Sequence, residues 1–218
     1  MQTLRRLRQV LSAVFFAGCL MSGSLTQASA IVTFDDLIQG QVSYGFDGDA
    51  DGINDVVFST SDPAGFNTIG PGVEQSFVHE PGLEGTSLLN PDLRVDFLRG
   101  ATGNIKFGFA LLSTSESPDW FASFKVFDAN HVLLGSVSAA GAFSVIGSGQ
   151  SSFPEGQISL SFAGVAAYGL FDFASQGGRF IMDDFAGDFG SVVPEPSTWA
   201  LLLLGCGMLL LLRRRPQF

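Results

Sequence analysis

Short apolar runs, separated by Gly, Pro, Asn and Asp, constrain the fold of this chain more than any other feature. In runs such as 105–111 and 157–162, large apolar residues alternate with smaller or polar ones, which is the period of a half-buried strand. Turn residues recur about every 8–12 positions, and residues 31–193 carry no long helical pattern. The sequence therefore predicts an all-β domain, an antiparallel β-sandwich that is jelly-roll-like. The expected strands are 31–34, 42–44, 56–59, 76–78, 93–98, 105–112, 121–128, 132–138, 157–162, 166–173 and 179–185, with a hairpin turn at 128–131.

The folded part is expected to be one domain over residues 31–186, followed by a linker at 187–193. A segment of this length is large enough to bury a core of its own. The two cysteines, Cys19 and Cys206, both lie outside it, so no disulfide can stabilise the domain. Its stability must come from the core, with or without a bound metal.

The first 30 residues have the layout of a secretory signal peptide. An apolar stretch, Val10–Leu25, is followed by Ala28-Ser29-Ala30, an A-x-A cleavage site. We therefore expect signal peptidase to cut after Ala30. The basic residues that precede the apolar stretch are Arg5, Arg6 and Arg8.

A lipoprotein signal is the alternative for this N-terminus. Phe16-Ala17-Gly18-Cys19 resembles a lipobox, which would make Cys19 a lipidated N-terminus. Phe16 departs from the usual Leu, and an A-x-A site lies downstream. Cleavage after Ala30 is therefore the favoured interpretation.

The C-terminus combines a Pro-Glu-Pro string, an apolar run and an arginine cluster. The run Ala200–Leu212 is uncharged, and with its flank it reaches the lower length limit for crossing a hydrocarbon core of about 30 Å. Arg213–Arg215 would hold the end of the chain in the cytoplasm. A transmembrane helix is thus expected over about 197–212. Pro194 and Pro196 keep the preceding segment extended and accessible to a membrane protease.

Pro194-Glu195-Pro196-Ser197-Thr198-Trp199, the short apolar helix and the arginines resemble the PEP-CTERM sorting signal over 194–218. The resemblance implies that exosortase, a membrane cysteine protease, is a partner and that Pro194, Glu195 and Pro196 form the processing signal. It also implies a bacterium that makes extracellular polysaccharide. The protein should therefore be exported, pass transiently through the inner membrane and end at the cell surface or in the extracellular matrix. A plain permanent anchor is the alternative, but it does not need the Pro-Glu-Pro string.

The predicted mature part is strongly acidic. Residues 31–193 hold five of the 11 basic residues and 20 of the 21 acidic ones, a formal charge of −15. This charge excludes nucleic acid as a partner, because phosphate neutralisation needs a basic surface. It fits the binding of divalent cations.

The string Asp47-Gly48-Asp49-Ala50-Asp51-Gly52-Ile53-Asn54-Asp55 is the sharpest candidate site. Carboxylates at alternate positions converge if the loop curls, and Ca²⁺ takes six to eight oxygen ligands. The string resembles the DxDxDGxxD loop of thrombospondin type 3 repeats, although Phe58 stands where an EF-hand has its bidentate Glu. A solvated acidic turn is the alternative, but its carboxylates would repel one another strongly. The expected ligands of a structural Ca²⁺ are Asp47, Asp49, Asp51, the Ile53 carbonyl and Asp55.

A second, weaker metal prediction combines the two ends of the domain. The strings Thr33–Leu37 and Phe180–Phe185 look like the first and last strands of carbohydrate-binding jelly-roll modules, which lie side by side and often hold a structural calcium. The carboxylates involved would be Asp35, Asp36, Asp183 and Asp184. The alternative is simple strand alternation, with one Asp of each pair facing solvent.

Two features of the sequence are candidates for a ligand surface. Trp120, at a strand start, is either a sugar-stacking platform or a core residue. The Gly/Pro-rich segment 79–92 is either a ligand-binding loop or a connector. The sequence has no GxSxG or HExxH motif, so we expect a non-enzymatic protein that binds or structures exopolysaccharide. A glycan-active hydrolase or lyase and an inert structural protein remain as alternatives.

Overall fold

In the computed structural model, the structure describes residues 29–68, 70, 75–86 and 93–189, which form strands and loops and no helix. They fall within one compact unit, Ala28–Ser191. Most of the predicted signal peptide, including Ala28 and Cys19, lies outside the described residues. So do Pro194, Glu195, Pro196 and the helix expected at 197–212. Among the described residues there is no helix that can cross a membrane.

The strands are short except for one. Their bounds are β1 Ala30–Val32, β2 Ser43–Phe46, β3 Val56–Thr60, β4 Leu83–Thr86, β5 Leu93–Leu111, β6 Phe121–Phe127, β7 Leu133–Ala140, β8 Val145–Ile146, β9 Gly149–Gln150, β10 Glu155–Ser161, β11 Ala166–Ala174 and β12 Arg179–Phe189.

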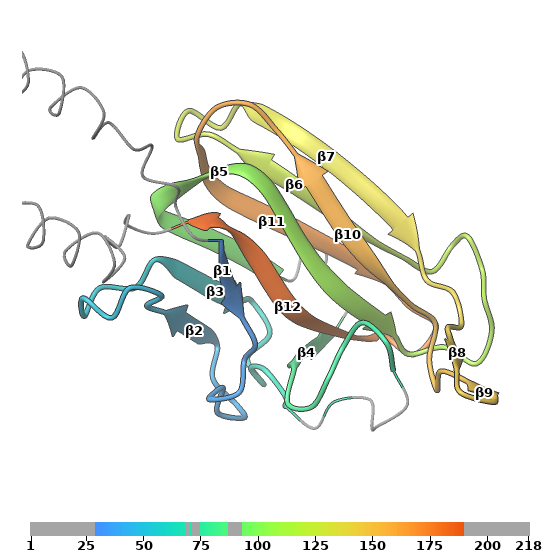
Figure 1. Ribbon diagram of the computed structural model, residues 1–218. Helices are drawn as coiled ribbons and strands as arrows, with labels where there is room; N and C mark the ends of the chain where they lie inside the picture. Colours follow the sequence, from blue (N-terminus) through green and yellow to red (C-terminus); the bar gives the residue numbers. More distant parts are fainter. Residues whose placement is uncertain (1–28, 69, 71–74, 87–92, 190–218) are drawn as a thin grey trace, which may run out of the picture. The chain divides into compact units, whose positions relative to one another are not determined.

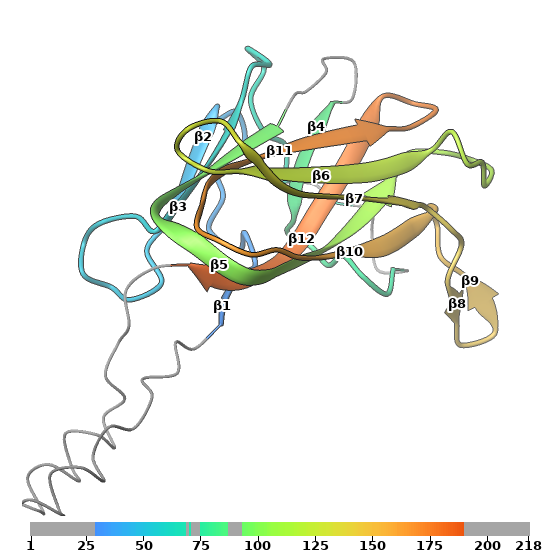
Figure 2. The same cartoon turned by 90° about the horizontal axis from the view of Figure 1, so that it is seen from above.

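The pairing is antiparallel throughout and forms two layers that share β5. One layer has the order β2-β3-β5-β11-β6-β7, and in the other β10 and β12 flank β5. Strands β1 and β4 both pair with β12. Figure 1 shows this arrangement, and Figure 2 shows β5 passing from one layer to the other. The predicted all-β antiparallel fold is confirmed.

The length of β5 corrects the predicted pair of strands at 93–98 and 105–112. These segments are the two halves of one 19-residue strand. The first half pairs with β3 and β11, and the second half with β10 and β12. Gly100 and Gly103 lie between the halves with φ of 81° and 76°, values that favour glycine. The glycines that looked like a strand break therefore let a continuous strand change layer.

Phenylalanine fills the space between the layers. Phe107 of β5 and Phe185 of β12 face Phe124 of β6 and Phe171 of β11, and all four are fully buried. The ring centroids of Phe107 and Phe171 lie 5.2 Å apart, and those of Phe124 and Phe171 lie 4.5 Å apart. Such aromatic pairs are worth about 0.5–1.5 kcal/mol beyond area burial. The unit thus carries a complete core of its own.

The structure differs from the sequence-based predictions in three segments. Residues 76–78 form no strand, because the buried Glu155 carboxylate binds the backbone N–H groups of Ser76 and Phe77. Part of segment 79–92, which was interpreted as a ligand-binding loop or a connector, is strand β4. Strand β12 runs to the buried Phe189, so the predicted linker at 187–193 begins too early.

The hairpin turn at 128–131 is confirmed. The Asp128 carboxylate accepts hydrogen bonds from the N–H groups of Asn130 and Val132, both at 2.8 Å. The His131 N–H donates to the Asp128 carbonyl at 3.1 Å. Such side-chain contacts to the backbone are the reason why Asp initiates turns.

Candidate metal centre

The acidic loop between β2 and β3 curls around its own carboxylates. Asp47 accepts hydrogen bonds from the N–H groups of Asp51 (3.2 Å) and Gly52 (2.7 Å). Ala50 and Gly52 have positive φ values of 57° and 87°. The predicted convergence follows, because carboxylate atoms of Asp47, Asp49 and Asp55 all lie within 4.8 Å of one another.

Asp55 is the most constrained member of this group. Its residue is 1% exposed, directly before β3. One oxygen, Oδ2, accepts the Gly48 N–H at 2.9 Å. The other, Oδ1, has no hydrogen-bond partner among the described residues. A buried carboxylate oxygen without a partner is costly, and a bound cation would remove that cost.

Arg99 of β5 reaches into the same loop, a contact that the sequence pattern of 47–55 does not indicate. Its Nη2 binds Asp51 Oδ2, its Nη1 lies 3.3 Å from Asp49 Oδ2, and its Nε lies 3.6 Å from Asp55 Oδ1. The hydrogen bond from Arg99 lowers the pKa of Asp51, while burial raises the pKa of Asp49. The negative charge of the loop is therefore partly neutralised by Arg99, whereas the sequence alone predicted strong repulsion among its carboxylates. Because Arg99 is 44 positions from Asp55, no local motif reveals the contact.

The predicted ligands thus separate into two groups. Asp47, Asp49 and Asp55 converge, whereas Asp51 is bound by Arg99 and does not belong to the converging group. The Ile53 N–H donates to Asp51 Oδ1, and the Ile53 residue is 57% exposed. A role for its carbonyl as a ligand stays a prediction.

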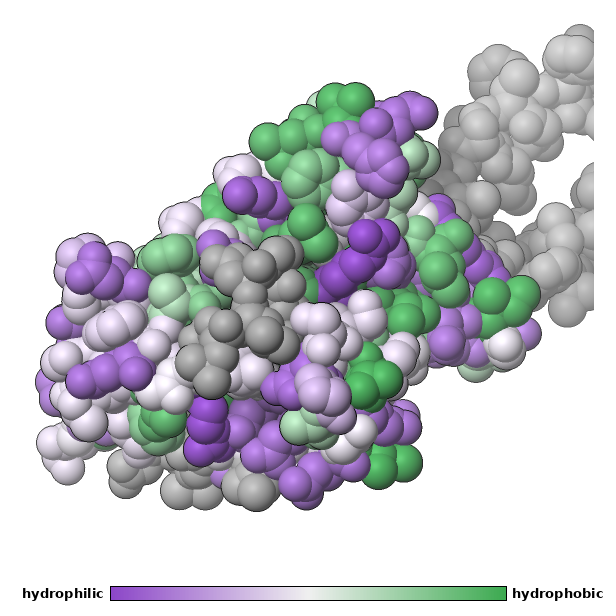
Figure 3. Space-filling view, turned by 180° about the vertical axis from the view of Figure 1, so that it is seen from behind, coloured by the Kyte–Doolittle hydropathy of each residue, from purple (hydrophilic) through white to green (hydrophobic). Residues whose placement is uncertain are grey.

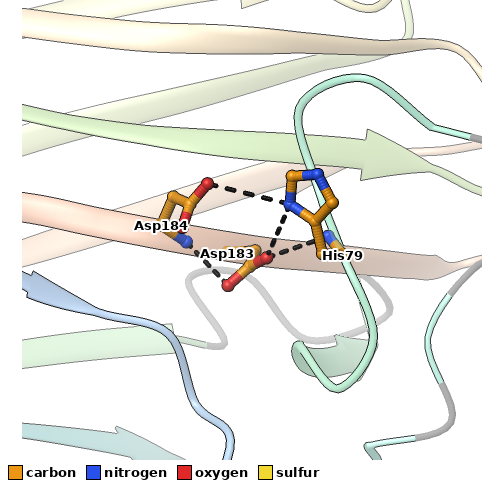
Figure 4. A group of neighbouring side chains, drawn as sticks. All are labelled: His79, Asp183 and Asp184. Atoms are coloured by element: carbon orange, nitrogen blue, oxygen red, sulfur yellow. Dashed lines mark hydrogen bonds and ion pairs between the residues drawn. The ribbon is translucent and has the colours of Figure 1, made fainter.

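A second cluster joins His79 to Asp183 and Asp184 of β12, as Figure 4 shows. His79 Nδ1 lies 3.5 Å from Asp183 Oδ2 and 3.8 Å from Asp184 Oδ2. Asp183 also accepts the backbone N–H groups of His79 (2.8 Å) and Asp184 (2.7 Å). Imidazole and carboxylate are both metal ligands, so this cluster is a second candidate centre.

A bulge in β12 makes this cluster possible. Consecutive strand residues normally point to opposite faces. Here the register with β5 shifts between Asp183 and Ala186, and Asp184 has a φ of 51°. Burial raises the pKa of Asp183 to about 6. The sequence showed the two aspartates but not the bulge that turns them toward His79.

The other half of the weaker metal prediction has separate partners. Strands β1 and β12 do lie side by side, with Val32 opposite Phe185. However, Asp35 accepts the Thr33 hydroxyl (2.7 Å), and Asp36 accepts the Tyr44 hydroxyl (2.6 Å). Among the described residues, no metal-ligating group joins Asp35 or Asp36 to Asp183 or Asp184. The structure thus does not bring these four carboxylates into one group, and a calcium ion held by them stays a prediction.

The outer face of the β3-β5-β11-β6 layer carries an aromatic and basic group. The Tyr168 ring stacks on Phe127, with centroids 5.0 Å apart, and the Arg94 guanidinium lies 4.2 Å from the Tyr168 centroid. Tyr168 Oη lies 3.0 Å from His131 Nδ1. Lys125 is exposed on the same side of β6 as Phe127. The alternation within 121–128 and 166–173 was the signal that could have placed these residues on one face.

Trp120, the residue singled out from the sequence as a glycan contact, is half-buried and packs against the core. A contact between Trp120 and a glycan stays a prediction. Hydrophilic and hydrophobic residues are interspersed over the surface seen in Figure 3.

Comparison with known proteins identifies the C-terminal tail. Residues 192–215 match the PEP-CTERM protein-sorting motif, which confirms the prediction made from Pro194–Trp199. The motif marks the chain as a secreted protein that exosortase directs to the cell surface. No curated protein matches the chain.

Solved structures similar to the folded part are distant in sequence. A carbohydrate-binding module with specific mannan recognition, TmCBM27, is 12% identical, with a TM-score of 0.44 over 75% of this chain and 99% of that one. The K3 cleaved adhesin domain of Lys-gingipain from Porphyromonas gingivalis W83 is 16% identical, with a TM-score of 0.36 over 73% and 98%.

Proposed function

We propose that this is a non-catalytic protein of the cell surface or extracellular matrix that binds or structures exopolysaccharide through a calcium-supported β-sandwich. The observation that carries the proposal is a sorting motif at 192–215 joined to a cysteine-free, strongly acidic sandwich. The sandwich has no disulfide, so an ion that tied its loops together would stabilise it outside the cell.

The proposed calcium ligands are Asp47, Asp49, Asp55 and, once released from Arg99, Asp51. Carboxylate oxygens suit a hard cation such as Ca²⁺. The buried Asp55 Oδ1, which accepts no hydrogen bond among the described residues, favours an ion over a merely solvated turn. Calcium would tie the loop to the start of β3, where the Leu98 N–H of β5 already donates to the Asp55 carbonyl.

The proposed glycan surface is the outer face around Tyr168. Sugar rings stack on flat aromatic surfaces, and charged side chains at the rim bind hydroxyl or carboxylate groups. Phe127, which is half-buried, would supply the aromatic surface, supported by Tyr168, which is buried against the Phe127 ring and the Arg94 guanidinium. Lys125 and the Arg94 N–H groups that Asp96 leaves free would act as hydrogen-bond donors. Both basic residues stand out on a domain in which acids outnumber bases by four to one.

A matched pair of lysine variants tests the glycan surface. Lys125 lies on this face, whereas the equally exposed Lys106 of β5 belongs to the half that pairs with β10 and β12. We expect Lys125→Ala to weaken retention on the exopolysaccharide of the producing bacterium, measured by affinity electrophoresis in calcium. Lys106→Ala should behave as the wild type. Equal retention of all three proteins would contradict the proposed surface, and turnover of the polysaccharide would indicate the enzyme alternative.

A further inference from the structure

We propose that Arg99 is a built-in counter-ion of the acidic loop and that Ca²⁺ displaces it on binding. The inference rests on the proposed calcium role of the loop and adds the residue that regulates it. Two states follow, one in which Arg99 neutralises the loop and one in which the ion does.

The contacts of the guanidinium carry the first step. Each of its three nitrogens faces a different carboxylate, at Asp49, Asp51 and Asp55. The side chain of Arg99 is 26% exposed, so it packs onto the loop and stays partly open to solvent. A guanidinium in this position binds two of the three converging carboxylates, Asp49 and Asp55, that a cation would need.

The guanidinium leaves part of the charge and hydrogen-bonding capacity of the carboxylates unmet. Arg99 Nε is 3.6 Å from Asp55 Oδ1, and that buried oxygen forms no hydrogen bond among the described residues. Four carboxylates also face a single positive charge. A divalent ion contacts oxygen at about 2.3–2.6 Å and carries twice the charge, so it suits Asp55 better than Arg99 does.

The two occupants exclude each other. Arg99 holds Asp51 apart from the converging group of Asp47, Asp49 and Asp55. An ion among these carboxylates would lie close to the guanidinium, and like charges at such distances repel strongly. Binding must therefore release Arg99, which also frees Asp51 to become a ligand.

Release of Arg99 would act on β5 itself. Arg99 directly precedes Gly100, where β5 passes from one layer to the other. Arg99 therefore links the acidic loop to the segment of β5 that connects the two layers.

The test compares the calcium affinity of Arg99→Met with that of the wild type, by calorimetry on the compact unit, residues 28–191. Lys106→Met is the matched control, because Lys106 is an exposed basic residue of the same strand in the half that pairs with β10 and β12. Removing a competitor that occupies at least nine-tenths of the molecules raises the apparent affinity about tenfold or more. We expect this gain for Arg99→Met and no gain for Lys106→Met. Arg99→Gln, which carries no positive charge, provides a second variant if Arg99→Met does not fold.

The possible failures are distinguishable. If the wild type binds Ca²⁺ and the Arg99 variants bind it with the same or lower affinity, Arg99 is no competitor, and the proposed calcium site stands. If the wild type and every variant leave Ca²⁺ unbound, the calcium site and the inference are both wrong. Tighter binding by the Arg99 variants alone supports the inference.

Discussion

At the scale of single residues, the buried carboxylates give the fold its most specific interactions. Glu155 binds the N–H groups of Ser76 and Phe77, and Asp183 binds that of His79. Both acids thereby hold the same irregular segment, 75–82, against the sheet. Hydrogen bonds to charged groups contribute about 1.5–3 kcal/mol each, more than most surface contacts.

Asp183 should make stability depend on pH. Its pKa is about 6 in the folded protein, against an ordinary value of 3.8, because burial disfavours the charge. The folded state thus keeps a proton that the unfolded state has lost, and wild-type stability falls as pH rises from about 4 to above 6. Asp183→Asn does not titrate at this position. As pH rises through this window, its free energy of unfolding should therefore increase relative to that of the wild type, by at most about 3 kcal/mol.

Urea unfolding of both proteins between pH 4 and pH 7.5, in EDTA, measures this difference. The same comparison in a His79→Gln background controls for the imidazole, which faces both carboxylates. A difference between Asp183→Asn and the wild type that did not change with pH would contradict the raised pKa.

The sequence was enough to predict which acidic residues converge within one loop, but not which distant residues contact them. The spacing of Asp47, Asp49 and Asp55 was enough to expect convergence, because alternation and a glycine turn act within nine residues. Arg99 and His79 come from segments 44 and 104 positions away from the aspartates they meet, Asp55 and Asp183. Only the pairing of the strands brings such residues together.

At the scale of elements, the crossing of segment 75–79 over β5 depends on Gly108. A Cβ built there would lie 1.6 Å from the Phe77 carbonyl oxygen. We therefore expect Gly108→Ala to push the segment off the sheet and to cost several kcal/mol, about the range of severe core changes. Hydrogen exchange at the Ser76 and Phe77 amides should accelerate along with a fall in melting temperature.

Gly149→Ala is the matched control for this change. Gly149 lies in β9, has no positive φ, and a Cβ there would meet only the Ile146 carbonyl oxygen at 3.8 Å. Stability and exchange at Ser76 and Phe77 should stay as in the wild type. If Gly108→Ala behaved like Gly149→Ala, the close crossing of the two backbones would be wrong.

Most strands were predictable because alternation is a local signal. The errors fall where a distant contact overrides it. Segment 76–78 has an apolar strand-like pattern, yet Glu155 takes its amides, and β4 has a loop-like composition but pairs with β12. The β5 glycines resembled a break because a change of layer and a turn both favour positive φ.

At the scale of the whole molecule, the two kinds of information come from different parts of the chain. The tail at 192–215 carries the sorting motif, and the described residues form the sandwich to which we assign any ligand. The central claim is therefore that the acidic sandwich, delivered to the surface, binds exopolysaccharide in a calcium-dependent way.

Co-sedimentation of residues 28–191 with the exopolysaccharide of the producing bacterium, in millimolar calcium and in EDTA, tests this claim most directly. We predict sedimentation with the polysaccharide in calcium and its loss in EDTA, because the loop at 47–55 would lose its ion. Equal binding in both conditions would contradict the calcium dependence. Failure to sediment in either condition would contradict the glycan role itself.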